Sequence, residues 1–251
     1  MNREGAKRLV QGFLGKQQAP DFGLEETGKI LPLGPMMEKL VKLSEAEFGM
    51  YAWSREPLEG KFDREQKLRY ILEAGRCGRE EAALLKAENK TGDPNIIANK
   101  MGLKVFTPDI PLGGGHVIFA QYVEPDEVTI FMDGVERAER LIADHSLGGI
   151  LEHVDVKSLL LAHEIFHWIE YCKEDSIYTR TEKVELWKRP FSNKSRLVCL
   201  GEIAGMEFAR EMLGISFSPY VLDVLLMYGY QEDAATALYE EIMEIVQMAA
   251  E

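Results

Sequence analysis

Long apolar runs, paired cysteines and excess basic charge are all missing from this sequence of 251 residues. No stretch approaches the about 20 consecutive apolar residues that a membrane-spanning helix needs. The apolar run behind the basic N-terminus is interrupted, so a signal peptide is not expected. Cys77, Cys172 and Cys199 are odd in number and lack CxxC spacing, which argues against a disulfide framework or a thiolate metal site. These absences favour a protein of the reducing cytoplasm.

Basic residues are outnumbered by acidic ones. The chain has 29 Lys and Arg against 42 Asp and Glu, a formal net charge of -13. A negative chain offers little electrostatic attraction to nucleic acid or to an anionic membrane surface, so we expect neither as a partner. Hydrophobic residues make up 46% of the chain, which at this length indicates a globular protein with a sizeable core.

The pattern along the chain indicates one mostly helical domain. Residues 1–34 are punctuated by Pro and Gly and are expected to form an N-terminal extension, followed by a single domain over 35–251. A strand pattern over 116–123 and 128–132, joined by a four-residue turn, suits an antiparallel hairpin. The fold class is therefore expected to be α+β with a small antiparallel sheet. Apolar periodicity predicts helices from 36 to before Pro57, over about 63–75, 79–89, 94–101, 134–143, 156–172 and 194–213, and from 218 and 232.

The chemistry is carried by an HExxH motif, HEIFH over residues 163–167, within an apolar helical segment. Positions i and i+4 share a helix face, so His163 and His167 can bind one zinc ion with Glu164 beside it. Zinc lowers the pKa of a bound water towards about 7, and a carboxylate can take its proton as the water attacks a carbonyl. Buried without a common partner, these three side chains would be costly. The alternative is a pair of core histidines with a surface glutamate.

A third metal ligand has to come from another part of the chain. The metzincin continuation requires Gly and His where this sequence has Glu170 and Lys173, so that class is excluded. Glu202 and Glu207, on a later helix, are the leading candidates. Glu202 shares a face with small and apolar residues, whereas Glu207 lies among charged neighbours. We therefore expect Glu202 to bind the metal and Glu207 to be solvated, with Glu207 kept as the alternative ligand.

Three segments in order resemble the ImmA/IrrE-type HExxH metallopeptidases, small bacterial zinc proteases of the gluzincin kind. The segments are Ile97–Val105, the motif with its preceding Leu161-Ala162, and the run from Glu202 to Leu213. The resemblance covers about residues 95–215, the expected catalytic core.

This resemblance implies His163, His167 and Glu202 as zinc ligands and Glu164 as the general base. It also implies that the strand over 117–123 is an edge strand beside the zinc, where an extended peptide can add by main-chain hydrogen bonds. The implied function is zinc-dependent hydrolysis of peptide bonds in a cytoplasmic protein substrate. Several members of the family cut helix-turn-helix repressors, so a transcriptional repressor is one candidate substrate.

Two other functions stay open. A metal-binding regulatory protein could keep the HExxH fold without turnover. A DNA-binding regulator is suggested by the helix-turn-helix-like run over 79–102, although the net charge opposes it. The oligomeric state is also open. Further side chains could assist at the site, by binding substrate, stabilising an oxyanion or orienting a ligand histidine, but ordinary core or surface roles suit them as well: His116, His145, His153, Glu170, Tyr178, Arg180 and Tyr220.

Overall fold

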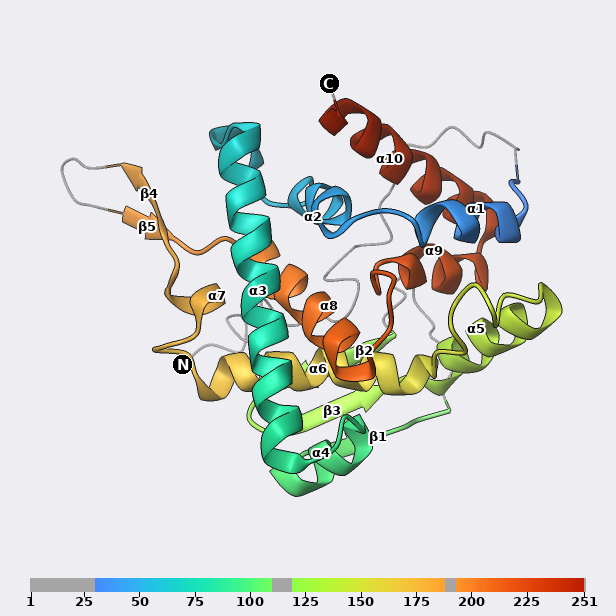
Figure 1. The fold of residues 1–251 in the computed structure, drawn as a ribbon, viewed down its shortest axis with the longest axis horizontal. Coiled ribbons are helices and arrows are strands. Elements are labelled where there is room, and N and C mark those ends of the chain that lie inside the picture. The colour runs from blue at the N-terminus through green and yellow to red at the C-terminus, as the bar shows by residue number, and fades with distance from the viewer. Residues whose placement is uncertain (1–29, 110–118, 188–192, 251) are drawn as a thin grey trace.

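The computed structural model describes residues 30–109, 119–187 and 193–250. Within these ranges the chain is mostly helical, with one three-stranded sheet and a separate two-stranded hairpin, which confirms the expected α+β class (Figure 1). Residues 1–29 of the expected N-terminal extension, His116 and residues 117–118 of the expected edge strand lie outside the described part. None of the described helices combines the length and apolar character needed to cross a bilayer.

The helical pattern that begins near Met36 is divided into α1 (Leu33–Leu40) and α2 (Glu45–Trp53). Ser44 makes the break by forming a capping box. Its hydroxyl accepts the Glu47 N–H, and the Glu47 carboxylate accepts the Ser44 N–H. The expected boundary after residue 34 falls inside the first turn of α1, where Pro35 costs no helical hydrogen bond.

A second correction concerns α3 (Arg64–Asn89), a single helix of 26 residues where the sequence predicts two helices separated near Gly75. Gly75 and Gly78 lie inside this helix, which crosses α8 (Cys199–Leu213) in Figure 1. A Cβ at Gly78 would lie 2.0 Å from the Ala204 carbonyl oxygen of α8. The glycine therefore permits a close contact between two helix backbones, and this packing outweighs its poor helix propensity.

The Gly78→Ala variant is expected to lose about 1–3 kcal/mol of unfolding free energy, because the new methyl group meets backbone atoms that cannot turn aside. Urea denaturation measures this loss. Gly149→Ala is the matched control, since nothing lies within 4 Å of its added Cβ, and its unfolding free energy should change by less than about 0.5 kcal/mol. Equal stability of the two variants would show that α3 and α8 are not in close contact at Gly78.

The sheet is mixed, with strand order β1-β3-β2. β2 (Ala120–Val123) and β3 (Glu127–Ile130) pair antiparallel as a hairpin, as the sequence predicts. β1 (Lys104–Phe106) instead pairs parallel with β3, so the expectation of an entirely antiparallel sheet is wrong for this strand. The connection between β1 and β2 is long enough to bring β1 to the far edge of β3 in a parallel direction. Among the described strands β2 is thus at an edge of the sheet, and it packs against α6 (Val156–Cys172).

The segment before α8 contains structure that the sequence pattern does not predict. α7 (Tyr178–Thr181) is followed by β4 (Val184–Trp187) and β5 (Asn193–Ser195), which form an antiparallel hairpin. This hairpin projects from the body of the molecule at the left of Figure 1. α8 accordingly begins at Cys199, later than expected.

The remaining described helices complete a common core. α4 begins at Pro94 and ends before Gly102, as expected, with Asp93 as its cap and Gly102 in the left-handed conformation. α9 is buried along its whole length, so at least this part of the tail belongs to the core. The bounds of these helices are α4 (Pro94–Met101), α5 (Met132–Asp144), α9 (Val221–Tyr228) and α10 (Glu232–Ala250), with a short 3-10 turn at Glu59–Lys61.

Candidate metal centre

α6 carries the HExxH motif at the centre of the fold. Its bounds agree with the sequence prediction, and Asp155 caps it by accepting the Ser158 N–H. β2, β3 and α8 all pack against this helix. His163 and Glu164 are both 0% exposed. The His167 side chain keeps 12% exposure. A buried histidine, a mostly covered one and a buried glutamate on one helix require polar or charged partners.

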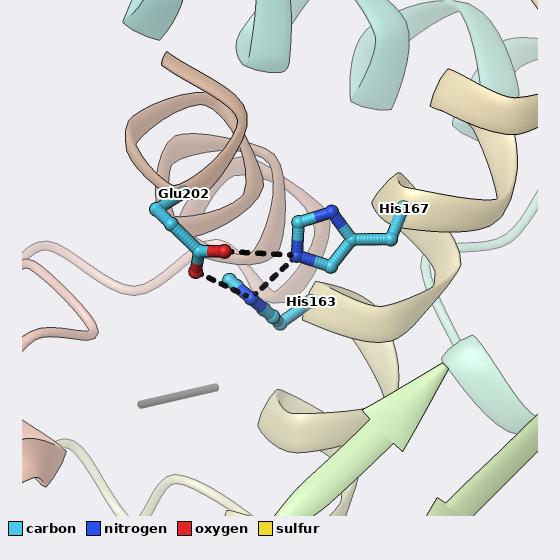
Figure 2. A group of neighbouring side chains, drawn as sticks. All are labelled: His163, His167 and Glu202. Carbon is cyan, nitrogen blue, oxygen red and sulfur yellow. Dashed lines mark hydrogen bonds and ion pairs between the residues drawn. The ribbon is translucent and has the colours of Figure 1, made fainter. Parts of the chain in front are cut away.

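The partner of the histidines is Glu202 of α8. The two Nε2 atoms of His163 and His167 lie 3.0 Å apart. Glu202 Oε2 is 3.5 Å from His163 Nε2, and Glu202 Oε1 is 3.7 Å from His167 Nε2. Figure 2 shows the two imidazoles and the carboxylate turned towards one another, so the structure brings together the three expected ligands.

These distances fit a tetrahedral metal ion. Zinc bonds of about 2.0–2.1 Å at tetrahedral angles place the ligand atoms about 3.3 Å apart, close to the spacing within this group. The donor set of two imidazoles and one carboxylate is also a common one for catalytic zinc. The three ligands among the described residues leave one position of a tetrahedral ion for a water or a substrate oxygen.

The charges around His167 also suit a cation. Burial by itself would lower the pKa of His167, but its hydrogen bond to Glu170 and the charges of Glu202, Glu170 and Glu164 raise it to about 9. The three carboxylates therefore favour a positive charge at the His167 ring. A divalent metal ion bound by the ring nitrogens would be favoured by the same carboxylates.

Glu164 has the properties of a proton acceptor beside this group. Neither carboxylate oxygen has a hydrogen-bond partner among the described residues. Burial raises the pKa of Glu164, while the charges of His163 and His167 oppose the rise. The backbone of Tyr122 on β2 lies near the Glu164 carboxylate, although outside hydrogen-bond geometry, and it also lowers the pKa of Glu164. A basic carboxylate with unused acceptor positions can take a proton from a water at the cluster.

Glu207 differs from its predicted environment. The expectation of a solvated side chain is wrong, because Glu207 is only 2% exposed. Its Oε2 accepts from Arg79 of α3 at 2.8 Å and lies 3.5 Å from Arg210. The face of α8 that carries charged residues is covered by α3, whereas the Glu202 side chain keeps 21% exposure. Glu202 as the ligand agrees with the geometry, but Glu207 is the buried glutamate and Glu202 the partly exposed one, the reverse of the expected burial.

The structure also separates the other side chains considered from the sequence. Glu170 Oε2 lies 2.9 Å from His167 Nδ1 and its side chain is buried, so of the two roles left open the contact with the histidine agrees with the geometry and the solvated one does not. Arg180 contacts the Glu170 carboxylate, 3.3 Å away. The Tyr220 hydroxyl is buried and has no hydrogen-bond partner among the described residues. Tyr178 is half-buried on α7, and the two remaining described candidates, His145 and His153, are exposed before α6.

Two glycines of α8 shape the centre, although sequence reasoning assigned them no role. A Cβ at Gly205 would lie 2.9 Å from Cε1 of His163, and a Cβ at Gly201 would lie 3.1 Å from Oε1 of Glu170. The absence of these Cβ atoms allows α8 to approach α6 closely. A signal was present in the sequence, because small residues four positions apart flank the Glu202 face of the helix.

Comparison of the chain with family models, with curated proteins and with solved structures gives no match. The assignment of the metal centre therefore rests on the residues and geometry of this chain.

Proposed function

We propose that this protein is a zinc-dependent metallopeptidase of the ImmA/IrrE type that hydrolyses peptide bonds of a cytoplasmic protein. The observation that carries the proposal is the convergence of His163, His167 and Glu202 next to the buried carboxylate of Glu164. His163 and His167 would hold zinc through their Nε2 atoms, and Glu202 through its carboxylate. When bound, zinc would supply a more acidic water and polarise the carbonyl of the substrate.

Glu164 and Glu170 have separate roles beside the zinc. Glu164 accepts the proton of the attacking water, because its buried carboxylate is a stronger base than an exposed one. It can then deliver this proton to the departing amine. Glu170 accepts from Nδ1 of His167, which keeps the Nε2 lone pair directed at the metal position. The enclosed setting of the motif excludes bulk water and strengthens these electrostatic interactions.

The edge strand β2 supports a peptide as the substrate. It lies at the end of the sheet, packs against α6 and brings the backbone of Tyr122 near Glu164. An extended peptide that pairs with this edge would run beside the metal centre, with side chains alternating between the two faces. The exposed Val123 at its end offers an apolar contact for such a peptide.

Metal content and hydrolysis test the proposal together. Protein purified without added metal is expected to contain about one zinc per chain by elemental analysis and to cleave an unfolded protein such as casein. A chelator should abolish cleavage, and added zinc should restore it. Failure to take up zinc on titration would contradict the metal centre itself. Zinc uptake without cleavage of unfolded substrates would favour the metal-binding regulatory protein as the function.

A further inference from the structure

The Glu170 carboxylate is held from three elements at once. On α6 its Oε2 lies 2.9 Å from Nδ1 of His167. On α7 the Thr179 hydroxyl donates to Oε1, and the Arg180 guanidinium donates from Nη2 to Oε2 at 3.3 Å. On α8 the backbone at Gly201 closes over the same carboxylate, as the 3.1 Å and 3.2 Å distances from an added Cβ to its two oxygens show.

This carboxylate is buried and needs its partners. Glu170 and Thr179 are each 3% exposed. Thr179 and Arg180 supply these partners, the hydroxyl at Oε1 and the guanidinium at Oε2. A carboxylate acceptor on Nδ1 makes the opposite nitrogen of an imidazole a stronger metal ligand.

We propose that Thr179 and Arg180 of α7 are positioning residues of the metal centre, which act on His167 through Glu170. The proposal rests on the proposed metal site. Thr179 and Arg180 together engage both oxygens of Glu170 and so fix its rotamer. The fixed carboxylate sets the tautomer and the ring plane of His167, because Nδ1 must then carry the proton.

The place of α7 in the chain extends this effect to the third ligand. α7 follows α6, which carries His167, and it packs against both α3 and α8. Glu170 presses against Gly201, the residue before Glu202. A Glu170 carboxylate that shifts would therefore disturb the spacing between His167 and Glu202, since it fills the contact between the two ligand-bearing helices. α7 thus keeps His167 of α6 and Glu202 of α8 at a fixed spacing.

The test uses Thr179→Val and Arg180→Met, each with a control of the same chemical type. Thr181→Val alters a threonine of α7 whose hydroxyl donates to Ile177 and does not contact Glu170. Arg196→Met removes an exposed arginine that pairs with Glu174. The measurements are zinc affinity, by competition with a chromophoric chelator, and the absorption spectrum of the cobalt-substituted protein.

Thr179→Val and Arg180→Met are expected to weaken zinc binding about 10- to 100-fold and to shift the cobalt bands, whereas both controls leave them unchanged. Thr179→Ser, which keeps the hydroxyl, should recover the wild-type affinity and spectrum and covers the case in which the valine variant does not fold. Wild-type affinity and spectrum in folded Thr179→Val and Arg180→Met would overturn the proposal, even with a lowered Tm. Absence of zinc binding by the wild type would overturn the proposed function first, before any variant is compared.

Discussion

The Glu164→Gln variant is expected to bind zinc with nearly wild-type affinity and to lose about 100- to 10,000-fold in kcat. Glutamine keeps the shape of the side chain but cannot accept the proton of the attacking water. The ligand atoms of His163, His167 and Glu202 are untouched by the change, so metal content should stay the same. Elemental analysis and hydrolysis of an unfolded protein substrate, measured on the same preparation, check both halves of this expectation.

The environment of Glu164 separates a catalytic effect from a folding effect. Its carboxylate is fully buried, and neither oxygen has a hydrogen-bond partner among the described residues. An ionised carboxylate in that position costs stability, so a neutral amide should not lower Tm. Glu139→Gln, at an exposed position of α5, is the control and should keep full activity. Substantial turnover by Glu164→Gln would exclude Glu164 as the general base.

The second large effect distinguishes Glu202 from Glu207 on α8. Glu202→Ala is expected to weaken zinc binding by more than the about 10- to 100-fold that loss of an outer hydrogen-bond partner causes, because a direct ligand is removed. The fold should be kept, since the Glu202 side chain is 21% exposed. His163→Ala should lose the metal in the same way and serves as the positive control.

Glu207→Ala should have the opposite result. Zinc binding is expected to remain, because Glu207 lies in an ion pair with Arg79 and Arg210 rather than in the ligand group. The unfolding free energy should fall by about 1–3 kcal/mol, since a buried acceptor is lost while Arg79 keeps its contact with Glu45. Urea denaturation measures this loss. Loss of zinc from Glu207→Ala with zinc retained in Glu202→Ala would make Glu207 the third ligand.

Much of the metal centre could be predicted from the sequence because the information is local. The spacing of His163 and His167 places both rings on one helix face whatever the rest of the fold does. The cap at Asp155, the start of α4 after Asp93 and the β2–β3 turn likewise depend on neighbouring residues alone. These interactions form within one turn or one hairpin, so the sequence specifies them directly.

Tertiary contacts decided the rest. A glycine often indicates a helix end, yet α3 continues through Gly78 because the Ala204 backbone of α8 packs against it. The sequence pattern predicts a solvated Glu207, yet α3 covers this side chain and Arg79 pairs with it. The contact of Thr179 with Glu170 needs α7 to fold back on α6. Each of these environments depends on which helix face meets a distant segment, and periodicity within one helix carries no information about that partner.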